Sequence, residues 1–128
     1  MDTTETKPIL LPELLEQALT LEEKQVIVHC CFPASPDFGS LIRIWRSTFL
    51  LDEHTGHRST LVHAENITFY PWWTEVPPMR DFWFTLIFSG LPADCKSFYL
   101  KEIIPQEGGF FISNIRRNSS DVYRVMIS

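Results

Sequence analysis

Histidines are the first residues in this chain whose spacing suggests chemistry, because imidazole is a common metal ligand and proton carrier. His54 and His57 lie in the run DEHTGH, where Asp52 or Glu53 would supply a third ligand. The run lacks the helix that holds paired histidines in zinc sites, and no further Cys or His follows at a recognised interval. The pattern therefore favours a solvated turn, and we expect neither a metal nor a cofactor.

The other two histidines, His29 and His63, lie in apolar runs that we predict to be strands. Two partly buried, hydrogen-bonded imidazoles explain them better than a metal site. No serine lies in the G-x-S-x-G turn that exposes a nucleophile beside a base. The carboxylates are scattered, so the sequence assigns no catalytic residue to them: Glu65, Asp81, Glu102 and Asp121.

Three cysteines make an odd count, and two of them are adjacent. On a strand, Cys30 and Cys31 point to opposite faces, which argues against a disulfide scaffold. Cys95, in the polar turn ADCKS, is the one candidate for a reactive thiol. The simpler interpretation, which we favour, is that all three act as small structural residues.

The aromatic residues are the remaining candidates for a function. Tyr70, Trp72, Trp73 and Trp83 form the candidate interaction surface, and three of them lie in or beside the proline-rich run PWWTEVPPMRD. Such rings remove much apolar area from water and lose little rotamer freedom. Three interpretations stay open: cover for the core, a protein or self-association surface, and a platform for carbohydrate or another small ligand.

Alternating and continuous apolar runs bounded by turn residues position these groups, and they predict an all-β fold. About seven or more short strands at this spacing indicate a sandwich or barrel. The runs cover residues 25–32, 41–51, 59–70, 81–92, 96–103, 109–115 and 121–127.

The run DFWFTLIFSGLP predicts a strand buried on both faces, with Phe84, Leu86 and Phe88 at the centre of the core. In the run 41–51 the better core face is the one that carries Trp45 and Phe49. Residues 12–20 fit either a short helix or a strand, and we favour a strand that begins near residue 15. We expect residues 1–14 to form a polar arm and residues 15–128 to form a single domain.

The charge of the chain limits the classes of partner. Its net charge of −5 opposes general binding to nucleic acid, because that affinity depends on many Lys and Arg. The polar N-terminus lacks the basic and apolar regions of a secretory signal, and no segment is apolar enough for a membrane helix. We therefore expect a cytoplasmic protein that binds neither nucleic acid nor membrane.

The runs IRIWRSTFLLDEHTGHRSTLVHAENI and FWFTLIFSGLPADCKSFYLKE share a pattern of structural residues with one known group. Through this pattern the chain resembles small bacterial immunoglobulin-like sandwich domains of uncharacterised function, over roughly residues 15 to 115. The resemblance implies an immunoglobulin-like fold and supplies no catalytic residue. The matching positions are Thr48, Phe49, Leu50, Ala64, Ile67, Phe84, Leu86, Phe88, Leu91 and Pro92.

Together these features indicate a non-catalytic binding or assembly module. We expect it to dimerise or to bind another protein, with Trp72 or Trp73 in the dimer surface, because exposed apolar patches usually mark contacts. The alternative is a ligand-binding or enzymatic domain with its site near Trp72 and Trp73.

Overall fold

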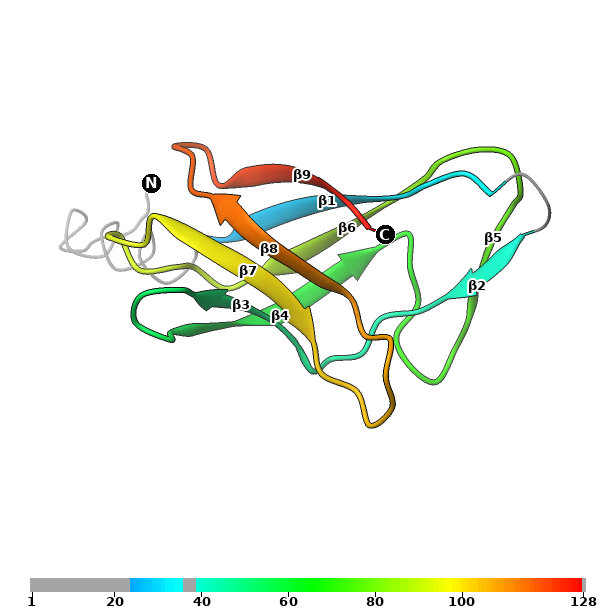
Figure 1. The fold of residues 1–128 in the computed structure, drawn as a ribbon, viewed down its shortest axis with the longest axis horizontal. Helices are drawn as coiled ribbons and strands as arrows, with labels where there is room; N and C mark the ends of the chain where they lie inside the picture. The colour runs from blue at the N-terminus through cyan, green and yellow to red at the C-terminus, as the bar shows by residue number, and fades with distance from the viewer. Residues whose placement is uncertain (1–23, 36–38, 128) are drawn as a thin grey trace, which may run out of the picture.

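The computed structural model describes residues 24–35 and 39–127, which form nine strands and no helix (Figure 1). Seven strands form one sheet in the order β8-β7-β3-β4-β6-β1-β9, and two short strands pair as β2-β5. The strands are β1 (Val26–Phe32), β2 (Ser40–Ile42), β3 (Thr48–Asp52), β4 (Arg58–Glu65), β5 (Thr74–Val76), β6 (Phe82–Phe88), β7 (Ser97–Glu102), β8 (Phe111–Arg116) and β9 (Val122–Met126).

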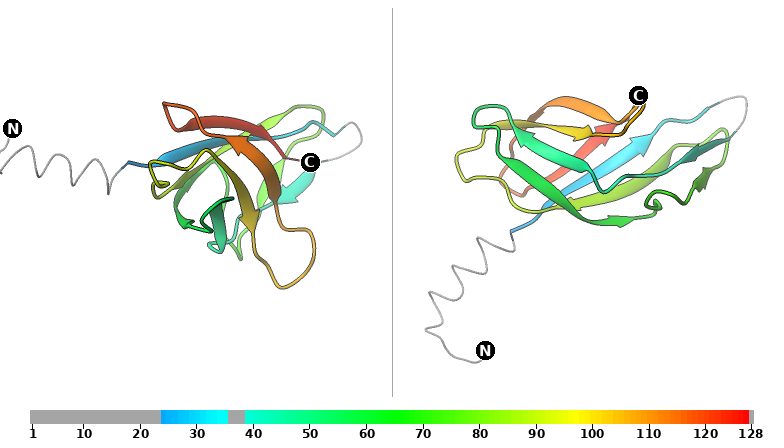
Figure 2. Two further views of the ribbon diagram at one scale, coloured as in Figure 1. Left: turned by 60° about the vertical axis from the view of Figure 1, so that its left-hand side comes forward. Right: turned by 90° about the horizontal axis from the view of Figure 1, so that it is seen from below.

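The seven-stranded sheet folds back on itself, so that β7 and β8 lie over β1, β6 and β9 (Figures 1 and 2). β4 joins the two layers, since it pairs with β3 on one side and with β6 on the other. The layers meet through rings such as Phe98 on β7 and Tyr123 on β9, whose centroids lie 5.0 Å apart, edge to face. The all-β prediction is therefore confirmed as a sandwich-like or barrel-like arrangement.

Two of the sequence predictions fall on residues that the structure does not describe. These are the polar arm at residues 1–14 and the choice between helix and strand at residues 12–20. The described part contains no helix long and apolar enough to cross a membrane.

β1 and β6 pair along their whole length and supply the centre of the core. Phe84, Leu86 and Phe88 are at most 2% exposed, as predicted. The prediction that this strand is buried on both faces is wrong. Trp83 is 45% exposed, because no described element covers the outward side of β6.

The prediction of one strand over residues 41–51 is also wrong. The chain leaves the β2-β5 ribbon after Ile42 and joins the main sheet only at Thr48. The predicted core face is also wrong: Trp45 and Phe49 are half-buried and lie on the outward side, because the residues that alternate with them point into the core. The buried positions are Ile42, Ile44, Thr48 and Leu50.

The predicted strand over residues 59–70 ends early, at Glu65. The next residue, Asn66, has φ 66°, a left-handed conformation that ends the strand and its pairing with β6. The proline-rich run after it contains β5, which sequence patterns did not predict, because a strand of three residues shows no periodicity.

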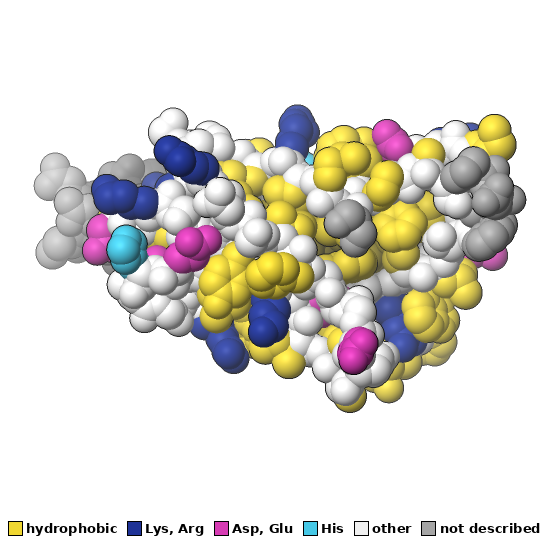
Figure 3. Space-filling view, in the orientation of Figure 1, with side chains coloured by type: hydrophobic (Ala, Val, Ile, Leu, Met, Phe, Trp, Pro, Cys, Tyr) yellow, Lys and Arg dark blue, Asp and Glu magenta, His cyan; other side chains and the backbone are white. Residues whose placement is uncertain are grey.

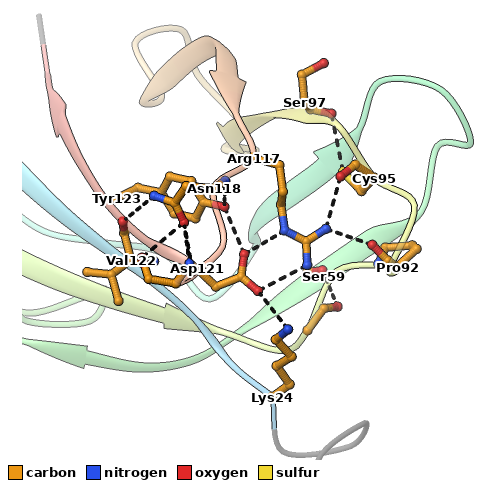
Figure 4. A network of polar contacts seen from close by, with 12 residues as sticks. Lys24, Ser59, Pro92, Cys95, Ser97, Arg117, Asn118, Asp121, Val122 and Tyr123 are labelled. Atoms are coloured by element: carbon orange, nitrogen blue, oxygen red, sulfur yellow. Dashed lines mark hydrogen bonds and ion pairs between the residues drawn. The ribbon is translucent and has the colours of Figure 1, made fainter.

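A buried ion pair fixes the corner between β8 and β9 (Figure 4). Arg117 Nε donates to Asp121 Oδ1 at 2.6 Å, and Nη2 donates to Oδ2 at 3.1 Å. Arg117 Nη1 donates to the carbonyl oxygens of Pro92, at 2.7 Å, and Cys95, at 3.2 Å. The Tyr123 hydroxyl donates to Asp121 Oδ1 at 2.9 Å. The pair therefore ties the β8–β9 turn to the β6–β7 connection.

Asp121 is 2% exposed, so its charge depends on these partners. Burial by itself would raise the pKa of the Asp121 carboxyl. Hydrogen bonds from Arg117 and Tyr123, with the charge of Arg117, outweigh burial and leave this pKa below its ordinary value. The folded state therefore binds the Asp121 proton less tightly than the unfolded state does, and the carboxylate stabilises the fold at neutral pH.

The first prediction concerns the core. We expect Phe88→Ala to lower the free energy of unfolding by about 3 to 5 kcal/mol, because the fully buried ring leaves a cavity. Urea denaturation followed by circular dichroism measures this change. Phe111→Ala is the matched control: that ring is 57% exposed, so the same substitution should lower the free energy by about 1 kcal/mol or less. Equal losses in the two variants would contradict the assignment of the core.

The second prediction concerns the corner. We expect Arg117→Met to lower the free energy of unfolding by about 3 to 5 kcal/mol at pH 7, because the buried carboxylate loses its hydrogen-bonded cation and keeps only Lys24, whose Nζ lies 3.9 Å away. This loss should shrink as the pH falls through the ordinary pKa of Asp, about 3.9, because the buried Asp121 of the variant takes up a proton above that pH, whereas the parent, in which the pKa is lowered, does so only below it. Arg116→Met, at the exposed neighbouring position, is the control. A loss that does not change with pH would show that Arg117 acts through packing alone.

Candidate functional site

The connection from β2 to β3 and the connection from β4 to β5 lie side by side. Ile44 bridges in parallel to Phe69, and its N–H donates to the Thr68 carbonyl at 2.9 Å. The Tyr70 N–H donates back to the Ile44 carbonyl at 2.8 Å. Because Ile44 is buried, its neighbours Arg43 and Trp45 face outward on the side where Tyr70 lies.

Four side chains from these connections form a stack, which we call the ladder: Trp73, Arg43, Tyr70 and Trp45. The guanidinium carbon of Arg43 lies 3.8 Å from the Trp73 ring centroid and 4.6 Å from the Tyr70 centroid. Tyr70 stacks on Trp45 with centroids 3.9 Å apart and an interplanar angle of 23°. A cation between two aromatic faces is a favourable arrangement, so the rings are held in place before any partner binds.

Hydrogen bonds hold the turn that carries Tyr70 and Trp73. The Thr68 N–H donates to Thr74 Oγ1 at 2.8 Å, and the Thr68 hydroxyl lies 3.0 Å from the Trp72 carbonyl oxygen. Arg43 Nη1 also donates to the Pro71 carbonyl at 3.2 Å. These hydrogen bonds fix the conformation of the turn and attach it to Arg43 of the ladder.

A groove of about 220 Å³ separates the ladder from the connection between β7 and β8. Arg43, Trp45 and Trp73 line one side of it. Glu102, at the end of β7, also lines it and joins the two sides: its Oε2 accepts the Trp45 N–H at 2.9 Å and its Oε1 accepts the Phe110 N–H at 3.1 Å. The remaining lining residues are Leu41, Ile42, Ile104, Gln106, Glu107, Gly108 and Phe110.

Burial raises the pKa of the Glu102 carboxyl above its ordinary value, and the two backbone hydrogen bonds and the charge of Arg43 offset only part of this effect. Both oxygens accept backbone N–H groups. The carboxyl therefore positions the two walls of the groove.

Exposed apolar side chains surround the ladder. Trp72 is 71% exposed and Leu41 55%, and the ladder rings Trp73 and Tyr70 are 52% and 49% exposed. Figure 3 shows hydrophobic side chains gathered on the half of the molecule that carries β2 and β5. Concentrations of this kind on small domains often coincide with surfaces that bind a partner or ligand.

The structure brings together only part of the predicted surface. Tyr70 and Trp73 stack in the ladder, and Trp72 lies beside them in the same turn, outside the stack. Trp83 projects from the outward side of β6, which pairs with β1 and β4, and belongs to a different face. The four aromatic residues therefore form two separate surfaces.

Sequence analysis missed Arg43, Trp45 and Glu102 as parts of this site. One signal was present: residues two apart in an extended segment share a face, so Arg43 and Trp45 had to lie together. Glu102 gave no such signal, because its place beside Trp45 depends on pairing between strands distant in sequence.

The histidines have ordinary partners. His54 and His57 are exposed in the β3–β4 turn, where Asp52 accepts hydrogen bonds from the turn, as expected for a solvated turn. His29 lies 2.7 Å from Thr85 Oγ1, and His63 lies 2.6 Å from Glu65. β6 separates β1 from β4, so His29 and His63 do not pair with each other.

The three cysteines are free and buried, and burial raises the pKa of each thiol. Among the residues that the structure describes, no group of three or more His, Cys, Asp or Glu side chains has a geometry suited to a metal ion.

Comparison with protein-family models, with curated protein sequences and with solved structures finds no match to this chain.

The third prediction concerns the groove. We expect Glu102→Gln to lower the free energy of unfolding by about 1 to 3 kcal/mol, because the amide turns an NH₂ group toward one of two buried N–H donors. Glu107→Gln, at an exposed position of the same connection, is the matched control and should change it by less than about 0.5 kcal/mol. Urea denaturation followed by tryptophan fluorescence measures both. A Glu102→Gln variant as stable as the parent would show that the Glu102 carboxylate does not hold the two sides of the groove together.

Proposed function

We propose that the protein is a non-catalytic binding module that holds a segment of a partner protein against the ladder and its groove. The observation that carries the proposal is the guanidinium of Arg43 held 3.8 Å from Trp73 and 4.6 Å from Tyr70, with both rings about half exposed. Trp, Tyr and Arg are the residue types that contribute most to the affinity of protein interfaces.

The surroundings of the ladder favour a protein segment over a small molecule. Leu41, which lines the groove and is 55% exposed, extends the apolar surface with an aliphatic side chain. The groove of about 220 Å³ is smaller than the roughly 300 to 1,000 Å³ of small-molecule pockets. It suits one side chain of a partner that lies across the rings.

Preorganisation supports the same function. The hydrogen bonds of Thr68 and the stacking of Arg43 fix the rings in the free protein. A binding surface that is already ordered loses less conformational entropy when the partner docks. Arg43 occupies the space between Trp73 and Tyr70, so a cationic ligand has no aromatic cage to enter.

A carbohydrate is the second candidate ligand. The groove carries Gln106 and Glu107 together with Trp45 and Trp73. Rings that stack on a sugar face and polar side chains that reach its hydroxyl groups are the two elements such a site needs.

We also propose that the fold is immunoglobulin-like. In immunoglobulin domains the strands are lettered A to G in chain order, and they lie in the order G-F-C in one sheet and D-E-B in the other. The orders β8-β7-β3 and β4-β6-β1 correspond to these if β1 is counted as B. Two departures are that β3 and β4 pair directly and that β9 pairs in parallel with β1.

We place the protein in the cytoplasm as part of the same proposal. Its three cysteines are free, a pattern that suits a reducing compartment.

The fourth prediction tests the binding surface. Peptides selected from a random display library on the parent protein should include binders that lose at least about tenfold in affinity for Trp73→Ala, which corresponds to about 1.4 kcal/mol. The same peptides should bind Trp83→Ala as well as they bind the parent, because Trp83 is an exposed ring on the outward side of β6, on a different face from the groove. Isothermal titration calorimetry measures both affinities.

A glycan array probed with the parent and with Trp73→Ala separates the two candidate ligands. Peptide binders that depend on Trp73, without glycan binding, support the protein segment. Glycan binding that depends on Trp73, without such peptides, replaces it with a carbohydrate. If the protein binds neither peptides nor glycans through Trp73, the proposed function is wrong.

A further inference from the structure

A second surface is independent of the ladder. It is the outward side of β4, β6, β1 and β9, which we call the outer face, and these four strands are neighbours in the sheet (Figure 2). Its residues alternate with inward ones: Val28 and Cys30 on β1, Tyr123 on β9, and Ile127 directly after β9 are buried. The residues between them therefore point outward.

Strand register orders the outer face in three rows across the strands. The first row, from β6 through β1 to β9, is apolar: Trp83, Cys31 and Met126, of which Cys31 is buried beneath its neighbours and Trp83 and Met126 are exposed. The third row, from β4 to β9, is mostly apolar: His63, Ile87, Ile27 and Val122. Met126 is 58% exposed and Val122 37% exposed, so large apolar side chains on this face remain open to solvent.

The middle row carries a charge at each end. It runs Glu65, Thr85, His29, Arg124, with Glu65 on β4 and Arg124 on β9. The carboxylate and the guanidinium stand three strand spacings apart, about 14 Å, which is too far for an ion pair within one chain. Glu65 keeps 64% of its side chain exposed beside His63, and Arg124 is exposed.

We infer that the outer face binds a second copy of this chain around a two-fold axis. The axis lies in the interface, parallel to the strands and between β6 and β1. This rotation exchanges the two ends of each row and keeps the rows in order. Glu65 then faces Arg124 of the second copy, and Arg124 faces Glu65, which gives two ion pairs. Trp83 then lies against the first row of the second copy, over the buried Cys31, and Ile87 faces Ile27, so the contacts between the charged ends are apolar.

Charge selects this axis over the other in-plane axis. A two-fold axis perpendicular to the strands would place Glu65 against Glu65 and Arg124 against Arg124, and like charges face to face cost several kcal/mol. The selected arrangement aligns the strands of the two copies, as in ordinary face-to-face packing of twisted sheets. It also provides local attraction between two chains that each carry a net charge of −5.

The test is a charge exchange measured by sedimentation velocity and equilibrium on the full chain. The parent should form a dimer, and Arg124→Glu and Glu65→Arg should each raise its dissociation constant at least about tenfold. The double variant Glu65→Arg, Arg124→Glu should return it to within about threefold of the parent, because the two ion pairs form again with their signs reversed. Circular dichroism melting checks that each variant is folded.

Two matched controls assign the effect to the outer face. Lys101→Glu changes the charge as Arg124→Glu does, but at an exposed position of β7, and should leave the dissociation constant unchanged. Trp73→Ala alters the ladder and should also leave it unchanged, so the dimer and the proposed function fail separately. A parent that is monomeric at about 100 µM, a double variant no tighter than the single variants, or dissociation by Trp73→Ala would each overturn the inference.

Discussion

The fold depends on closing a sheet whose two edge strands, β8 and β9, follow one another in the chain but do not pair. The closure is made by the buried pair of Arg117 and Asp121, two residues at opposite ends of one short turn. Arg117 also binds two carbonyl groups of the β6–β7 connection, and the Asp121 carbonyl accepts the Ile27 N–H at 2.9 Å. One ion pair therefore sets where β7, β8, β9 and β1 meet, and the core forms between them.

The candidate site also contains a buried carboxyl that organises a connection, but the pKa of this carboxyl is shifted in the opposite direction. Glu102 and Asp121 are both buried carboxyls that organise a connection, yet the pKa of Asp121 is lowered and that of Glu102 is raised. The difference lies in the partner. Asp121 has a guanidinium within hydrogen-bonding distance, whereas Glu102 accepts two backbone N–H groups, which together with the charge of Arg43 offset only part of the effect of burial. The corner is thus held by charge, and the groove by hydrogen bonds to neutral groups.

Periodicity in the sequence was enough to predict the strand content and the core at Phe84, Leu86 and Phe88, because these depend on local alternation. It failed where the chain changes partners. The run 41–51 alternates as one strand would, but its first part pairs with β5 and its last part with β7 and β4. The ladder shows the same limit: its aromatic residues were recognisable candidates, but their stacking with Arg43 depends on two connections meeting in space.

The distribution of the aromatic residues follows from this architecture. A thin sandwich offers inward positions only on alternate residues of each strand, and Phe84, Phe88 and Phe98 fill them. Trp45 and Trp83 fall at outward positions and therefore lie at the surface. Their neighbours there differ. Trp45 lies beside the cation of Arg43 and stacks on Tyr70, which favours an ordered site that recognises a partner of different shape. Trp83 lies on a flat sheet face whose charges are separated at its two ends, and a face of that kind is complementary to itself.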